Sequence, residues 1–72
     1  MKKVVRLENL DCANCAAKLE RAINKIDGVQ ANVNFMAMKM TLECADERYP
    51  AAAEEIRRVA GRVEPECVFK GL

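Results

Sequence analysis

This 72-residue chain contains no histidine and no tryptophan, and its charges nearly cancel. Without histidine, and without a general base placed beside a nucleophile, the chain offers no recognisable catalytic group. Twelve Lys and Arg residues against eleven Asp and Glu residues give a net charge of +1, which argues against a nucleic-acid partner. One Tyr and two Phe residues are too few to form a platform on which bases stack.

Long apolar runs are also missing. No stretch approaches the roughly 20 apolar residues that cross a bilayer, so we expect no membrane insertion by this segment. The charged N-terminus, Met1–Arg6, lacks the apolar run of a signal peptide. Apolar residues nevertheless make up 51% of the chain, which is too many for a disordered protein. We expect one small domain, residues 1–72, that is soluble, monomeric and cytoplasmic.

Two hydrophobic periods follow one another along the chain. Apolar and polar residues alternate over Lys2–Glu8, Val29–Phe35 and Met38–Glu43, which predicts three strands. The segment Ala13–Ile26 instead carries apolar residues at three- and four-residue steps, which predicts a helix. Asp27-Gly28 supplies the helix stop, because glycine readily adopts the left-handed conformation after a last turn.

The second half of the chain predicts another helix and a final strand. Pro50 is suited to a first helical turn, and Ala51–Ala60 is rich in good helix formers that Gly61 then ends. Val63–Phe69 predicts a short strand that is kinked or at an edge because of Pro65. The order β-α-β-β-α-β predicts an α+β, ferredoxin-like fold with two helices on one face of a four-stranded antiparallel sheet.

Four cysteines carry the main functional information. Cys12 and Cys15 form a C-x-x-C pair between the first predicted strand and helix, whereas Cys44 and Cys67 stand alone. In a chain without a secretory signal, such a pair indicates metal binding or redox chemistry. Free N–H groups and the positive end of a helix stabilise thiolates, and thiolates are the form that binds soft metals.

These residues also have simpler interpretations. A redox dithiol of the thioredoxin type is an alternative, although the chain is short for that fold and has no Trp or Pro within or beside the pair. Asp11 is either a metal ligand or a helix cap. By strand parity, we expect Cys44 and Cys67 to pack as small apolar residues in the core.

A period-two stripe of methionines admits two interpretations. Met36, Met38 and Met40 would suit a copper thioether site, but methionine also fills irregular cores. Since a strand at this position must bury one face, we predict that all three belong to the core.

The segment Asn9-Leu10-Asp11-Cys12-Ala13-Asn14-Cys15 resembles the metal loop of heavy-metal-associated domains. These are ferredoxin-like modules that occur as small metallochaperones and as N-terminal heads of heavy-metal P-type ATPases. The resemblance covers nearly the whole chain. The usual loop reads Gly-Met-x-Cys-x-x-Cys, and here Asn9 replaces Gly and Leu10 replaces Met. We expect Leu10 to plug the core beneath the site and to preserve the loop.

The residue before the first cysteine indicates the kind of ion. Asp11 resembles the aspartate of zinc-, cadmium- and lead-exporting ATPases, whereas copper members carry a neutral residue there. Cu(I) with two thiolates is already net negative, and a carboxylate adds to that charge. A divalent ion with two thiolates is neutral and accepts an oxygen ligand. We therefore expect Zn(II), Cd(II) or Pb(II) as the cargo rather than Cu(I).

A further ligand is implied by the loop after the second predicted helix. Glu64-Pro65 resembles the Glu-Pro of some zinc and cadmium members, although a solvated glutamate or a water ligand remains open. The predicted metal ligands are thus Cys12, Cys15, Asp11 and Glu64. The resemblance implies that the partners are the metal ion and the transporter part of a longer chain or of another protein. A copper(I) chaperone or copper-ATPase domain is the main alternative.

Overall fold

The computed structural model describes the whole chain, from Met1 to Leu72. Neither helix combines the length and the apolarity needed to cross a membrane. In chain order the elements are β1 (Lys2–Glu8), α1 (Ala13–Asn24), β2 (Gln30–Asn34), β3 (Lys39–Glu43), a 3-10 turn η1 (Asp46–Arg48), α2 (Tyr49–Val63) and β4 (Val68–Lys70).

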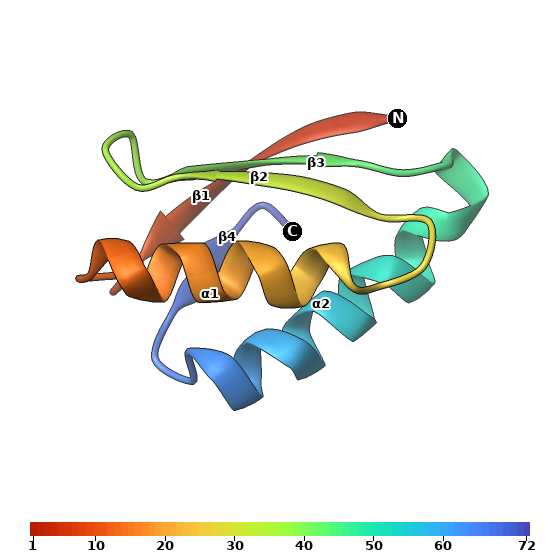
Figure 1. Ribbon diagram of the computed structural model, residues 1–72. Coiled ribbons are helices and arrows are strands. Elements are labelled where there is room, and N and C mark those ends of the chain that lie inside the picture. Colours follow the sequence, from red (N-terminus) through yellow and green to blue (C-terminus); the bar gives the residue numbers. More distant parts are fainter.

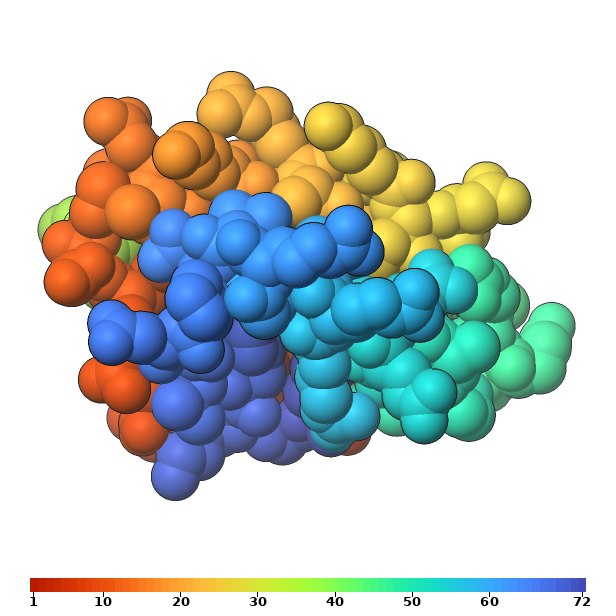
Figure 2. All heavy atoms as spheres, turned by 90° about the horizontal axis from the view of Figure 1, so that it is seen from below, coloured from red at the N-terminus to blue at the C-terminus, as the bar shows by residue number.

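The strands form one sheet in the order β2-β3-β1-β4, and every neighbouring pair is antiparallel. Both helices cover the same face of this sheet (Figure 1), and the opposite face is open. Seen from the helix side, α2 lies across the domain beside α1 (Figure 2). The element order and the layer arrangement are those predicted from the sequence.

The core lies between the sheet and the helices. Val5 and Leu7 alternate inward along β1, where Val5 pairs with Met40 of β3. Full burial of one such side chain contributes about 1.5–3 kcal/mol to stability. Seven large side chains are at most 2% exposed, and they come from both the sheet and the helices: Val5, Leu7, Leu19, Ile23, Met40, Leu42 and Ile56.

Side chains of α1 fasten the helix to the edge strand β2. The Asn24 amide donates to the Ala31 carbonyl (2.9 Å) and accepts from the Ala31 N–H (2.7 Å). Glu20 Oε2 accepts from the Val33 N–H at 2.8 Å. These bonds fix the position of α1 on the sheet, and they occupy backbone groups that an exposed edge would otherwise offer to another strand.

The helix ends differ from the sequence-based prediction. α2 continues through Gly61 to Val63, and Glu64 leaves the helical conformation (φ −138°, ψ 77°). Pro65 is the cause, because a residue before proline is pushed out of the α region. The predicted strand Val63–Phe69 is therefore wrong over Val63–Cys67, and β4 comprises Val68–Lys70.

The helix α1 is also shorter than predicted, since it ends at Asn24 rather than at Ile26. Ile26 is still buried, but its N–H bonds to the Ile23 carbonyl (3.0 Å) within a turn. A buried side chain at helical spacing thus extended the apparent helix by two residues. The difference does not move the N-terminal end of α1, which carries the cysteine pair.

The methionine stripe is only partly in the core. Met40 is fully buried and Met38 is half-buried, but Met36 is 91% exposed, so its predicted burial is wrong. The turn between β2 and β3 is closed by the Ala37 N–H, which donates to Asn34 Oδ1 at 3.0 Å. Met36 lies at the tip of this turn, where the period of two no longer applies.

Candidate metal-binding site

The loop that joins β1 to α1 turns sharply at Asn9. Asn9 has φ +63°, in the left-handed region that glycine adopts most easily and that asparagine tolerates among residues with a side chain. Asparagine therefore permits the turn at the position where the resembled loop has glycine. Leu10 then points into the core with 3% exposure, as predicted, and Asp11 is exposed.

Cys12 is the N-cap residue of α1. Its backbone is extended (φ −149°, ψ 132°), and its Sγ accepts a hydrogen bond from the Cys15 N–H at 3.3 Å. The Cys12 carbonyl accepts from the Ala16 N–H at 3.0 Å, which begins the helical pattern. The alternative in which Asp11 caps the helix is therefore wrong, because a thiol takes that position.

The two thiols differ in how readily they lose a proton. The pKa of Cys12 lies below its ordinary value, because hydrogen bonding by the Cys15 side chain, and then by the Cys15 N–H, stabilises the thiolate. The pKa of Cys15 rises to about 11, first through its hydrogen bonding with Cys12 and then through burial. The dithiol thus loses its protons in separated steps, and the first leaves a thiolate at Cys12.

Glu64 lies beside the second thiol. It follows α2 directly, and its N–H donates to the Ala60 carbonyl at 2.7 Å. Its carboxylate interacts with the Cys15 thiol and is a further cause of the raised pKa of Cys15. Figure 2 shows this segment, in blue, next to the orange-red segment that precedes α1. The fold therefore brings Glu64 from the far end of the sequence to the cysteine pair.

Asp11 precedes Cys12 in the chain, and its charge opposes the lowering of the Cys12 pKa. The influences on the thiol pKa values act in pairs: Cys15 on Cys12, Asp11 on Cys12, and Glu64 on Cys15. No group of three or more Cys, Asp or Glu side chains is gathered closely enough to hold an ion. The four predicted ligands therefore lie near one another in pairs and do not converge on one point.

The two other cysteines are separate from this pair in the sequence and half-buried. Both pack against the hydrophobic core, as predicted. The pKa of Cys67 is raised, mainly by burial and also by the nearby charge of Glu64. The carboxylate of Glu64 thus raises the pKa of both Cys15 and Cys67, a proximity that strand parity alone did not reveal.

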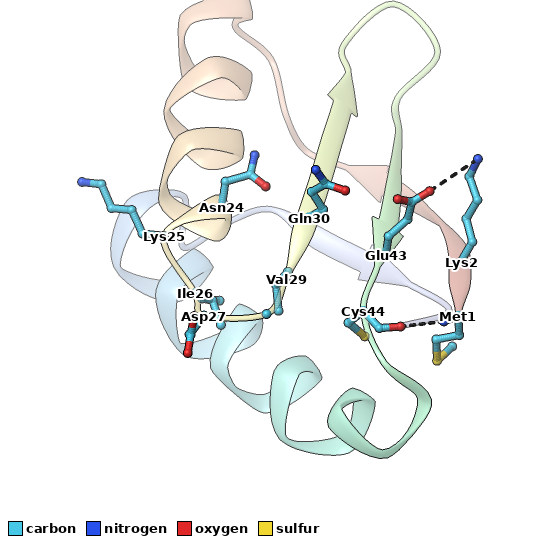
Figure 3. A pocket seen from close by; sticks show the side chains of 11 residues that line it. Met1, Lys2, Asn24, Lys25, Ile26, Asp27, Val29, Gln30, Glu43 and Cys44 are labelled. Atoms are coloured by element: carbon cyan, nitrogen blue, oxygen red, sulfur yellow. Dashed lines mark hydrogen bonds and ion pairs between the residues drawn. The ribbon is translucent and has the colours of Figure 1, made fainter.

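An open depression of about 850 Å³ lies at the opposite end of the domain (Figure 3). The ion pair between Lys2 and Glu43 and the hydrogen bond from the Met1 amine to the Cys44 carbonyl border it. None of the four predicted metal ligands lines it. The candidate metal site is therefore an exposed loop rather than a cavity.

The sequence model of the heavy-metal-associated domain family matches residues 4–69 of this chain. A protein of Staphylococcus aureus strain MRSA252, described as a "Probable cadmium-transporting ATPase", is 50% identical over 69 residues. Those residues are 94% of this chain but 9% of that ATPase, so the chain spans less than a tenth of its relative.

Two solved structures have a fold similar to that of this chain. The N-terminal domain of a potential copper-translocating P-type ATPase from Bacillus subtilis has a TM-score of 0.70 and 28% identity, over 96% of this chain and 82% of that one. The CopZ metallochaperone has a TM-score of 0.73 and 21% identity, over 96% and 98% of the two chains. These similarities confirm the ferredoxin-like fold.

Proposed function

This chain belongs to the heavy-metal-associated domain family, and on that premise we propose that it captures a divalent soft metal ion and passes it on. The cargo is Cd(II), Zn(II) or Pb(II), and the ligands are the thiolates of Cys12 and Cys15 with oxygens from Asp11 and Glu64. The domain serves as a cytoplasmic head of a heavy-metal-exporting P-type ATPase. The 50% identity with the described cadmium-transporting ATPase supports this proposal.

The observation that carries the proposal is the pair of carboxylates beside the thiols. Asp11 acts on Cys12, and Glu64 acts on Cys15. Two thiolates neutralise a divalent ion, and such an ion still accepts further oxygen ligands. The same two thiolates leave Cu(I) with a net negative charge, so the neighbouring carboxylates oppose copper and favour a divalent cargo.

The protonation states suggest the order of ligation. The Cys12 thiolate makes the first contact, since its pKa is lowered, and Cys15 gives up its proton to solvent as the ion approaches. Rotation of the Asp11 or Glu64 side chain then completes the ligand set. Because the loop is exposed, thiols of a partner can enter while these ligands leave, which suits transfer better than permanent storage.

Copper is the second candidate. The structural similarity to a copper-translocating ATPase domain at 28% identity favours it, and Cu(I) requires only the two thiolates. A thiol–disulfide redox module is the candidate of another class, and it requires a reversible Cys12–Cys15 disulfide. The copper hypothesis and the divalent-ion hypothesis differ in the role that each gives to the carboxylates of Asp11 and Glu64.

The decisive experiment compares metal affinities of the reduced protein and its charge-neutral variants. Asp11→Asn and Glu64→Gln preserve side-chain shape and remove the charge. We expect each to weaken Cd(II) and Zn(II) binding by about ten-fold, in the range found for groups that support a metal site, while Cu(I) binding stays equal or improves. Competition with a chelator of known affinity measures both.

Glu66→Gln is the matched control, because Glu66 is exposed in the same turn and acts on neither thiol of the pair. It should leave all affinities unchanged. Tighter binding of Cu(I) than of Cd(II), with no response to Asp11→Asn or Glu64→Gln, would establish the copper alternative instead. Turnover of a disulfide substrate with no metal retained would establish the redox alternative.

A further inference from the structure

The open face of the sheet consists of cross-strand rows whose composition follows from the register. One row joins Lys2 of β1 to Glu43 of β3, and these side chains form an ion pair at 3.7 Å. The next row joins Val4 to Thr41 and is uncharged. Opposite charges or neutral residues therefore face each other in these two rows, as a stable sheet requires.

The third row is different, because it places three cations side by side. Arg6 of β1 lies directly opposite Lys39 of β3 on one side and opposite Lys70 of β4 on the other. All three residues are exposed. We call these three residues the cationic row. Two strand spacings separate its ends, so it spans about 10 Å.

The charges of the cationic row are poorly compensated within the domain. Arg6 and Lys39 take part in none of the ion pairs. Lys70 has a single acidic neighbour, Glu8, at 4.0 Å, and both side chains are about half exposed. Like charges directly opposite one another destabilise a sheet, so this row lowers the stability of the free domain. An acidic partner would remove that cost.

The surroundings of the row indicate the form of the partner. Glu8 and Glu43 lie on the same face, and an extended anionic surface such as a membrane would meet these charges as well. A short acidic segment can instead cover the row alone. Carboxylates on successive turns of a helix are about 6 Å apart, which allows two or three of them to match a row of this length.

We propose that the cationic row Lys39–Arg6–Lys70 is a docking site for an acidic helical segment of a protein partner. The row lies on the face away from both helices, two residues before the end of β1, which leads into the metal loop. A segment held there leaves Cys12, Cys15 and the helix face free. The partner can therefore be held while the ion is exchanged.

The test uses the full 72-residue protein and a synthetic helical peptide of about 15 residues with three Glu residues on one face. At low salt, the peptide should shift the backbone NMR signals of Val4–Glu8, Lys39–Thr41 and β4, and the shifts should vanish at high salt. The same peptide with Gln in place of Glu should not bind. Phosphatidylserine vesicles test the membrane as an alternative ligand.

Two triple variants with equal charge change separate this surface from general attraction. Arg6→Gln/Lys39→Gln/Lys70→Gln should weaken peptide binding by about five-fold or more, since each pair contributes modestly. Lys18→Gln/Arg21→Gln/Lys25→Gln, on α1 and its C-cap, should change peptide binding less than two-fold, within about 0.4 kcal/mol. Cd(II) affinity should be the same in both variants, so failure of this proposal and failure of the metal-binding proposal are distinguishable.

A single substitution gives a second, opposite readout. Lys39→Glu places an acid opposite Arg6, so it should raise Tm by about 1–8 °C while it weakens peptide binding. The proposal is overturned if the peptide shifts signals on α1 instead, if the Arg6/Lys39/Lys70 variant binds as well as the natural protein, if vesicles bind and the peptide does not, or if Lys39→Glu lowers Tm.

Discussion

Ion pairs are concentrated at one end of the sheet. Three of the four lie at the end that holds the N-terminus and the start of α2. At the end that holds the metal loop, Glu8 pairs with Lys70, but Asp11 and Glu64 have no cationic partner in any ion pair. The ion pairs of the first end are Met1 amine–Asp46 (3.2 Å), Lys2–Glu43 (3.7 Å) and Arg48–Glu55 (3.8 Å).

Some carboxylates are thus neutralised by ion pairs within the domain, whereas Asp11 and Glu64 remain available to bind a cation. Surface pairs of the first kind contribute little to stability, typically below about 1 kcal/mol. A carboxylate beside a thiol raises local negative charge and gains from any cation that arrives. The metal loop is therefore locally acidic, because Asp11 and Glu64 take part in no ion pair, although the whole chain has a net charge of +1.

The largest expected effect is the loss of a thiol at the metal loop. Cys12→Ser or Cys15→Ser should weaken Cd(II) binding by about 1,000-fold, because the chelating thiolate pair is lost. Cys44→Ser, at the opposite end, should change the affinity less than two-fold (about 0.4 kcal/mol). Thiolate-to-metal charge-transfer absorption measures all three variants, and an equal loss in Cys44→Ser would remove the distinction between the ends.

Removal of the side chain beneath the loop should have the next largest effect, on stability. Leu10→Ala should lower the free energy of unfolding by about 3 kcal/mol, because Leu10 is 3% exposed and its loss leaves a cavity. Val4→Ala on the open face is the control, and it should cost less than about 1 kcal/mol because Val4 is 59% exposed. Urea unfolding without metal distinguishes them, and equal costs would mean that Leu10 does not support the loop.

The pH dependence of metal binding should follow the two thiol pKa values. Above the lowered pKa of Cys12 and below about 11, where Cys15 is still protonated, each bound ion displaces one proton. The Cd(II) affinity should therefore rise about ten-fold per pH unit in this range. Glu64→Gln removes a cause of the raised Cys15 pKa and so shifts the upper limit of the range to lower pH. A pH-independent affinity would contradict the assigned protonation states.

The smallest effect should come from the paired end. Glu43→Gln breaks the ion pair with Lys2, whose side chain is 66% exposed, and should lower stability by less than about 1 kcal/mol. Metal affinity should not change. Thermal unfolding and a Cd(II) titration check both statements, and a reduced Cd(II) affinity would show that the two ends are coupled.

Much of the fold could be predicted because hydrophobic periods reflect the layer that each face covers. The alternation of Val5 and Leu7 in β1 identified the buried face correctly. The errors arose where local signals compete. Gly61 was expected to end the second helix, but it is exposed with open space around it, and the helix continues until the residue before Pro65.

The metal site was only partly predictable for a different reason. The C-x-x-C spacing is local, so it places both cysteines at the start of a helix without knowledge of the tertiary structure. The position of Glu64 beside Cys15 depends on how the chain returns from α2 to the loop, so no local pattern gives it, and the sequence indicated Glu64 only through the family resemblance. The capping role of Cys12 was also missed, because a thiol is an uncommon cap where an aspartate precedes it.

Side-chain carboxylate NMR during metal titration will show whether the carboxylates of Asp11 and Glu64, which take part in no ion pair, become ligands of a divalent ion. We expect the carboxylate carbon signals of Asp11 and Glu64 to shift in proportion to added Cd(II) up to one equivalent and not to shift with Cu(I). The carboxylate signal of Glu66 should not shift with either ion. If Cd(II) perturbs the cysteines while both carboxylate signals remain unchanged, the carboxylates are not ligands and the account is wrong.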